Sequence, residues 1–204
     1  MNKQKQSGVT LIELSVVLLI LVALAGLVSP YVGGTGQKAM CEATDVSMQN
    51  IKKVIMENYY VDTLGKYPKK PNDGTICTTD TCYNLTCLFE SCGIPDFDPV
   101  TNVGFRKGGY LQNGIVLNLD PDSSFQDTTK VNDNVVSGQT QVLDAWGRPI
   151  ILQQKNDGNF RLVSAGFDGV INTSLSNAVQ PDDRVLYLNI PIPSGEQNTP
   201  CEQY

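Results

Sequence analysis

One acidic side chain, Glu13, interrupts an otherwise apolar stretch near the N-terminus. The twenty residues from Val9 to Val28 contain only two other polar side chains. An ionisable group in such a segment is rare enough that a functional partner is the first hypothesis. A cut between Gly8 and Val9 would create a free amine four residues from Glu13, one helical turn away on the same face. We therefore predict that Glu13 is an assembly residue, whose carboxylate pairs with such an amine in its own or a neighbouring chain.

Three aspartates form a second set of side chains that could bind a ligand. Asp168, Asp182 and Asp183 bracket a polar loop. Calcium prefers roughly six to eight oxygen ligands from carboxylates, amides and main-chain carbonyls, and such a loop offers all three kinds. The simpler interpretation is that the three acids are solvated turn residues. The sequence therefore allows a structural calcium site, and it predicts no organic cofactor.

The chain contains cysteine but no histidine. Without histidine it cannot build a Cys/His zinc site or use a histidine general base. Four of its cysteines recur at every fifth residue, which is wider than the paired spacing usual for zinc knuckles. If the N-terminal segment exports the rest of the chain, disulfide bonds are the better interpretation, and the sequence leaves their pairing open. The six candidates are Cys41, Cys77, Cys82, Cys87, Cys92 and Cys201.

Charge and composition exclude further classes of function. The chain of 204 residues carries a formal net charge of -6, and because Lys3 and Lys5 are the only charges before Gly8, the remainder carries -8. Nucleic-acid binding needs clustered lysine and arginine, so we exclude nucleic acid as a partner. The chain has no Gly-x-Ser-x-Gly elbow and no pair of glutamates in an evident cleft, and we expect no enzyme activity.

The apolar stretch that contains Glu13 predicts a membrane-spanning helix over residues 9–29. Twenty residues at about 1.5 Å each make a helix of roughly 30 Å, the thickness of the hydrocarbon core. The short basic leader, residues 1–8, would stay in the cytoplasm and place the body outside. An ordinary secretory signal would have a shorter apolar region, with its small residue after it rather than before it. A plain signal anchor would explain every feature except Glu13.

The rest of the chain, residues 30–204, predicts one globular domain of the α+β class. Residues 30–60 continue the helix, which we expect to bend or loosen near Pro30 and the Gly33-Gly34 pair. Residues 70–99 form a cysteine-rich loop, and residues 100–204 contain short strand-like runs separated by turn residues. The run from 150 to 164 is typical of a hairpin. We therefore expect a long N-terminal helix packed on a small antiparallel sheet. The helix face expected to pack comprises Ala43, Met48, Ile51, Val54, Ile55 and Tyr59.

The N-terminal run "GVTLIELSVVLLILVALAGLVSP" resembles the signal of type IV prepilins and type II secretion pseudopilins. In that family a prepilin peptidase cuts after the glycine that matches Gly8 and methylates the new terminal amine, here that of Val9. Glu13 matches the glutamate of the family's motif, and Pro30 matches its helix-interrupting proline. The resemblance implies a type IV pilin-like fold and a subunit that polymerises through its N-terminal helix.

Shorter motifs, "GKYP", "GGYLQ", "DAWGRPIILQ" and "LVSAGFDG", resemble those of the major, G-type pseudopilin and occur in the same order. In that group calcium is bound in the loop after the last motif, by ligands that include later aspartates. Asp168 lies in the matching turn, and Asp182 and Asp183 lie near the positions of the later acids. The resemblance implies a homopolymer that works with other pseudopilins, an assembly ATPase and an inner-membrane platform protein. Its location would be the bacterial inner membrane, with the globular domain in the periplasm, and later a periplasmic filament.

Two alternatives remain open. The first is a type IV pilin for adhesion, motility or DNA uptake, because such pilins usually end in a disulfide-closed loop and Cys201 lies close to the C-terminus. The second is a membrane-anchored binding module that recognises a ligand through its cysteine-rich loop and never polymerises. Glu13 distinguishes this binding module from a pilin or pseudopilin, because only a polymerising subunit would need Glu13 for assembly.

Overall fold

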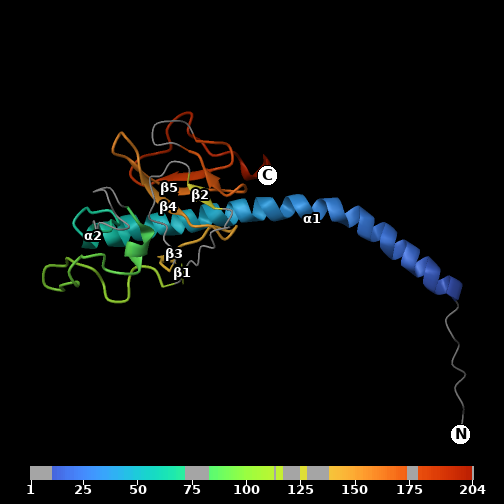
Figure 1. The fold of residues 1–204 in the computed structure, drawn as a ribbon, viewed down its shortest axis with the longest axis horizontal. Helices are drawn as coiled ribbons and strands as arrows, with labels where there is room; N and C mark the ends of the chain where they lie inside the picture. The colour runs from blue at the N-terminus through green and yellow to red at the C-terminus, as the bar shows by residue number, and fades with distance from the viewer. Residues whose placement is uncertain are drawn as a thin grey trace, which may run out of the picture.

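A long, nearly continuous helix forms the axis of the protein. The computed structural model describes residues 11–71, 83–112, 114–116, 125–127, 138–173 and 179–203. Helix α1 (Leu11–Lys53) leads into the π-helical turn η1 (Val54–Tyr59) and the short helix α2 (Tyr60–Asp62). The helix passes through Pro30 without stopping, and it curves along the half that projects from the globular body (Figure 1). The expected single long helix is therefore present.

Among the described residues, no helix has both the length and the apolarity that crossing a membrane requires. Residues 9 and 10 of the span that the sequence predicts over residues 9–29 lie outside the described residues.

The helix ends where the sequence places a glycine. Thr63 donates both its amide and its hydroxyl to the carbonyl oxygen of Tyr59, at 2.9 and 2.7 Å, which satisfies one of the last helical acceptors. Leu64 and Gly65 then take positive φ values of 55° and 84°. The amide of Gly65 bonds back to the carbonyl of Tyr60 at 2.8 Å. Residues in the left-handed backbone conformation commonly end helices, and here they turn the chain toward Lys66.

A three-stranded antiparallel sheet packs against the C-terminal half of α1. Its strands are β4 (Ile151–Gln154), β5 (Phe160–Ser164) and β7 (Arg184–Tyr187), in the order β4-β5-β7. β4 and β5 form the expected hairpin, in which Lys155 and Asn159 close the turn. Gly158 supplies the positive φ of 83° that this turn requires. The sequence thus identified the central hairpin of the sheet.

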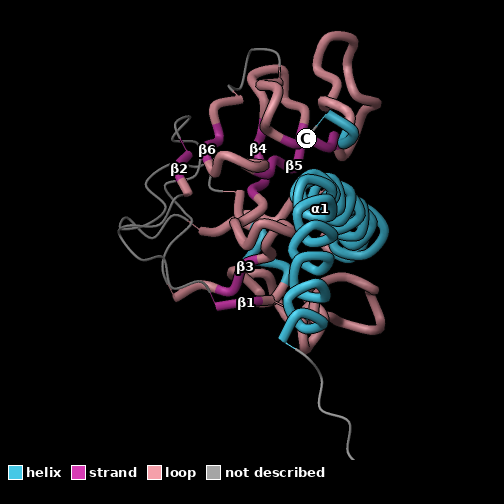
Figure 2. The backbone as a smooth tube through the Cα atoms, turned by 90° about the vertical axis from the view of Figure 1, so that its right-hand side faces the viewer, coloured by secondary structure: helices cyan, strands magenta, loops and turns pink. Residues whose placement is uncertain are grey.

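Two smaller strand pairs complete the described strands. β1 (Ile115–Val116) pairs with β3 (Thr140–Gln141) in antiparallel fashion, whereas β2 (Gln126–Asp127) pairs with β6 (Val170–Ile171) in parallel. In Figure 1 the β1–β3 pair lies below the helix and β4–β5 lies above it, and Figure 2 shows the two groups of strands apart from each other beside α1. The run 109–112, one of the strand-like runs of the sequence, forms an irregular segment instead, in which the amides of Tyr110 and Leu111 bond to the carbonyl oxygen of Leu88. The parallel pair was not expected, because it joins segments that are distant in sequence.

The core lies between the helix and the sheet. The buried helix face repeats every three or four residues, as an amphipathic helix should, and it packs against buried residues of β4 and β5. Ala43 was assigned to this face wrongly, because it is exposed and Thr44 is buried instead. The Thr44 hydroxyl accepts a hydrogen bond from the amide of Ala145 at 3.1 Å, which makes its burial possible. The buried face comprises Cys41, Thr44, Met48, Ile51, Ile55 and Tyr59.

Two single-turn 3₁₀ helices complete the described helices. η2 (Leu85–Leu88) is buried and is capped by Asn84, whose side chain accepts a hydrogen bond from the amide of Thr86 at 2.9 Å. η3 (Cys201–Gln203) is the last described element, and it lies beside α1. The C-terminus therefore returns to the helix that begins the chain.

Candidate functional site

The N-terminal half of α1 is an exposed apolar surface. Every large apolar side chain from Leu11 to Leu24 is between 50% and 88% exposed. A contiguous apolar surface of this kind marks a site of interaction with protein or membrane. We call residues 11–24 the apolar segment. In Figure 1 it projects away from the sheet, so the globular body does not cover it.

Glu13 lies in the first turn of α1, within the apolar segment. A carboxylate at this end of a helix interacts favourably with the helix dipole. Gly8 and Val9, the expected cleavage and methylation residues, lie outside the described residues. Pro30 lies inside α1, where the helix continues through it.

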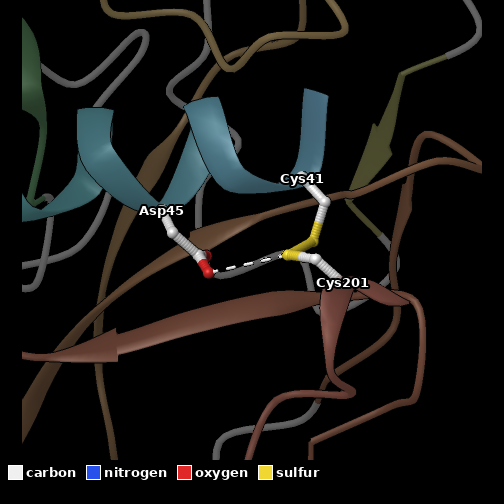
Figure 3. Close-up of side chains that lie close together, drawn as sticks. All are labelled: Cys41, Asp45 and Cys201. Atoms are coloured by element: carbon white, nitrogen blue, oxygen red, sulfur yellow. Dashed lines mark hydrogen bonds between the residues drawn. A yellow bond between two sulfur atoms is a disulfide. The ribbon is translucent and has the colours of Figure 1, made fainter. Parts of the chain in front are cut away.

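A disulfide bond joins the two ends of the globular body. Cys41 in α1 is bonded to Cys201 in η3, with a Cα–Cα distance of 5.7 Å across a sequence separation of 160 (Figure 3). A second bond joins Cys87 and Cys92, only 5 residues apart. Cys77 and Cys82 lie outside the described residues. The structure thus selects pairings that the spacing of the cysteines left open.

Cys41, Cys201 and Asp45 lie together, but they do not form a metal centre. Their potential ligand atoms lie within 4.8 Å of one another. Both sulfurs are consumed by the disulfide, so neither is a thiolate, and the Cys201 sulfur merely lies 3.9 Å from Asp45. The Asp45 carboxylate instead receives two hydrogen bonds from the guanidinium of Arg184. The disulfide and the hydrogen bonds between Arg184 and Asp45 therefore hold β7 and the C-terminal segment against α1.

The three expected calcium ligands are brought near one another by a close contact between two turns. Gly166 has a φ of 56°, and a Cβ there would lie 1.8 Å from the main-chain oxygen of Asp182. Only glycine fits this approach, which explains the glycine before "FDG". It places the turn containing Asp168 against the segment with Asp182 and Asp183.

Within this cluster, Asp183 has one unused oxygen. The residue is fully buried, and its Oδ2 accepts hydrogen bonds from the amides of Asn172 and Thr173 at 3.1 and 2.7 Å. Its Oδ1 is buried with no hydrogen-bond partner among the described residues. A buried carboxylate oxygen without a partner is costly, and a cation would compensate it.

The other two acids repel each other. Burial, a hydrogen bond with Asp168 and the charges of Asp168 and Asp183 raise the pKa of Asp182 to about 6. Asp168 is exposed, and its Oδ1 accepts a hydrogen bond of 2.7 Å from the amide of Val170. The carboxylate oxygens of Asp168, Asp182 and Asp183 lie farther apart than the potential ligand atoms of Cys41, Asp45 and Cys201. The donor set fits calcium if main-chain carbonyls and water complete it, with Asp182 and Asp183 as the side-chain ligands.

The "DAWGRP" motif builds a turn rather than a binding site. Asp144 accepts hydrogen bonds from the amides of Trp146 and Arg148, both at 2.9 Å, and from the Ser164 hydroxyl at 2.6 Å. The indole of Trp146 donates to Gln37 in α1 at 2.9 Å. The motif therefore connects β5 to the helix, through the Ser164 hydroxyl on one side and the half-buried Trp146 indole on the other.

Ion pairs that the sequence did not indicate hold the C-terminal segment on the sheet. Arg161 in β5 is completely buried and lies 3.3 Å from Glu196, while Lys155 lies 2.8 Å from the other oxygen of Glu196. The Tyr187 hydroxyl donates to Glu196 as well. At the end of α2, Arg106 likewise donates two hydrogen bonds to the buried Asp62, at 2.5 and 2.9 Å. Only the side chain's three-dimensional neighbours distinguish Glu196 from an ordinary surface glutamate.

Replacing Glu196 with alanine should lower the free energy of unfolding by about 3–5 kcal/mol, because two buried cations lose their shared partner. Burial alone would raise the pKa of Glu196, but hydrogen bonds from Lys155 and Tyr187 and nearby cationic charge hold it below its usual range. The stabilisation is therefore present above the ordinary carboxyl pKa and is lost as the pH falls through the folded-state value. Urea unfolding at pH 7 and in acid measures both effects.

The control for this experiment is Glu57→Ala, which breaks an exposed pair with Lys53 at 4.0 Å. It should change stability little, because exposed ion pairs are screened by water and salt. An equal effect of the two substitutions would contradict the assignment of Glu196 as the partner of both buried cations.

The comparisons with known proteins bear on the N-terminal segment. The prokaryotic N-terminal methylation motif matches residues 3–29. No curated protein and no solved structure matches the chain. The matched range includes the bond between Gly8 and Val9 and also Glu13. The motif implies processing by a prepilin peptidase and polymerisation, so this chain carries the N-terminal segment of a type IV pilin-like, prepilin-type protein.

Proposed function

We propose that this protein is a structural subunit of a type II secretion pseudopilus. Prepilin peptidase removes residues 1–8 and methylates the amine of Val9. The mature chains then polymerise through the N-terminal half of α1 and drive protein export from the inner membrane through the periplasm. Other pseudopilins, an assembly ATPase and an inner-membrane platform protein are its partners, and the subunit itself catalyses no reaction.

The observation that carries this proposal is the apolar segment, residues 11–24. Its side chains are exposed in the isolated chain although burying them would be favourable, at about 25 cal/mol for each Å² of apolar surface. Helices of neighbouring subunits can bury this surface as a bundle, with the globular bodies outside. The curved helix that extends beyond the sheet provides the necessary reach (Figure 1).

The position of the long disulfide supports a pseudopilin over an adhesive type IV pilin. Cys201 is bonded to Cys41 in α1, 160 residues away, and not to a cysteine near the C-terminus. The bond therefore does not close the short C-terminal loop usual in type IV pilins. The order of the four short motifs points in the same direction.

Determination of the mature N-terminus tests this function. The chain should be expressed with a prepilin peptidase and analysed by intact mass and N-terminal peptide sequencing. We expect a chain that begins at Val9 and carries a methyl group on its amine. Expression without the peptidase is the control and should give the full chain. Retention of residues 1–8 in the presence of an active peptidase would exclude the proposed maturation.

We further propose that calcium binds the cluster of Asp182 and Asp183, with Asp168 nearby. The ion would offset the mutual repulsion of the acids and use the unpaired Oδ1 of Asp183. Its role would be structural, because it would hold the loop between residues 168 and 183 against the sheet.

Calcium at about 100 times its dissociation constant should stabilise the protein by about 2.7 kcal/mol and raise Tm by roughly 5–10 °C. Asp182→Asn should remove most of this increase, because it removes a ligand charge. Asp96→Asn, a change of an exposed acid outside the cluster, is the matched control. Thermal unfolding in calcium and in chelator gives the measurement. Equal Tm values in both solutions would rule out the site.

A further inference from the structure

A cavity of about 590 Å³ lies beside the end of the long helix, on residues that the proposed assembly function does not use. It is formed by the segment that follows α2, by Cys92–Ile94 and by the β4–β5 hairpin. This volume lies in the range of cavities that bind small ligands. The lysines and aromatic residues of its walls all belong to the described part of the chain.

One wall of the cavity is cationic. Lys66, Lys69 and Lys70 all line it, within one short stretch that follows the helix end. None of the three forms an ion pair with a described residue, although the chain as a whole is acidic, with a net charge of -6. Three ammonium groups around one cavity attract an anion, and they would repel a cationic ligand.

Aromatic side chains also line the cavity. Tyr67 stacks on Phe160 of β5, with ring centroids 3.8 Å apart and planes 19° apart. Tyr83 meets the same Phe160 ring edge-on, with centroids 4.7 Å apart. Burial raises the pKa of both tyrosines, so their hydroxyls stay neutral and do not oppose an anion. Aromatic rings held in place in this way provide apolar contact at low entropic cost.

We propose that this cavity binds a small ligand in which an anionic group, a carboxylate or a phosphate, is attached to a ring. The lysines would bind the anionic group, and the ring would contact Tyr67, Tyr83 and Phe160. The cavity lies near α2, at the end of the body opposite the projecting half of α1 (Figure 1). Packing through the apolar segment therefore leaves it open, and this binding goes beyond the structural role of the subunit in a filament.

Phenyl phosphate is the first probe, because it combines one anionic group with one ring. Its binding to the full chain in a polyoxyethylene detergent can be measured by isothermal titration calorimetry. Inorganic phosphate lacks the ring and benzyl alcohol lacks the charge, so each should bind at least about tenfold more weakly. The double variant Lys69→Ala/Lys70→Ala should weaken phenyl phosphate by about tenfold or more for the same reason.

The matched control is Lys53→Ala/Lys107→Ala, which removes the same charge from exposed lysines outside the cavity. It should leave the affinity unchanged. All four lysines are at least partly exposed, so both double variants should fold, and near-ultraviolet circular dichroism verifies this. No saturable binding, or an equal loss of affinity in the two double variants, would overturn the proposal.

A second titration distinguishes the possible sources of the ligand. A disaccharide of glucuronic acid represents acidic sugars, and uridine monophosphate represents nucleotides. If either compound binds more tightly than inorganic phosphate, the result supports the proposed binding at the cavity and identifies the class of ligand. Failure of both to bind more tightly than inorganic phosphate would exclude acidic sugars and nucleotides as ligands, whereas the phenyl phosphate titration decides whether a ring contributes to binding. None of these results depends on cleavage at Gly8, so the outcome is independent of the test of maturation.

Discussion

Replacement of Glu13 by alanine should abolish filament assembly and leave the globular domain folded. The carboxylate lies in the first turn of α1, inside the apolar segment that assembly would bury. Without it, the amine of Val9 on a neighbouring chain would be buried with no opposite charge. Leaving one partner of a buried ion pair alone costs about 3–5 kcal/mol, which weakens each contact between subunits by roughly 100-fold to 5,000-fold.

Electron microscopy and sedimentation of filaments from cells that express the secretion system measure this effect. Glu42→Ala is a matched control in the same helix, because Glu42 is exposed and its pair with Lys38 at 3.7 Å lies on the surface. Glu13→Asp keeps the charge on a shorter side chain and should give partial assembly. Thermal unfolding of Glu13→Ala in detergent should match the wild type, because the first turn of α1 lies outside the globular body (Figure 1). Normal filaments of Glu13→Ala would refute the assembly role.

Loss of the bond between Cys41 and Cys201 should produce the largest change in stability. A disulfide restricts the unfolded chain, and its effect grows with the length of the loop that it closes. For a sequence separation of 160 the chain-entropy relation gives about 5 kcal/mol. The same relation gives about 2 kcal/mol for Cys87 and Cys92, whose separation is 5. The double variant Cys41→Ser/Cys201→Ser should therefore unfold at much lower urea concentration than Cys87→Ser/Cys92→Ser.

Urea unfolding of these two double variants and the wild type tests the prediction, and the short-loop variant serves as the control. Similar urea midpoints for the two variants would contradict the assigned pairing of the cysteines, which sets the two loop lengths.

The long disulfide also has a mechanical consequence. It joins the last described helix to α1, so force applied along α1 reaches the C-terminal segment through a covalent bond.

Much of the local structure could be predicted from the sequence. The repeat of apolar residues from Met48 to Tyr59 predicted the helix that packs on the sheet, and the glycine-containing turn between two apolar runs predicted the β4–β5 hairpin. These features depend on contacts between residues close in the chain, and so a short window of sequence contains their cause. The methylation motif at residues 3–29 is local in the same sense.

The sequence was less reliable where an element depends on its partners. The run 109–112 has strand composition, yet it is irregular, and its Tyr110 and Leu111 amides bond to Leu88 of η2. Ala43 is more apolar than Thr44, yet Thr44 is buried because the amide of Ala145 reaches its hydroxyl.

The sequence by itself determined the long N-terminal helix, the central hairpin, the position of Glu13 in an apolar segment and the motif that contains it. The tertiary structure decided which cysteines pair, that Glu196 joins Arg161 and Lys155, that Gly166 brings the three aspartates near one another, and that three lysines share a cavity with aromatic rings. The physical reason is distance along the chain. Helix periodicity and turn chemistry act within a few residues, whereas burial and charge pairing depend on neighbours that only the folded chain brings together.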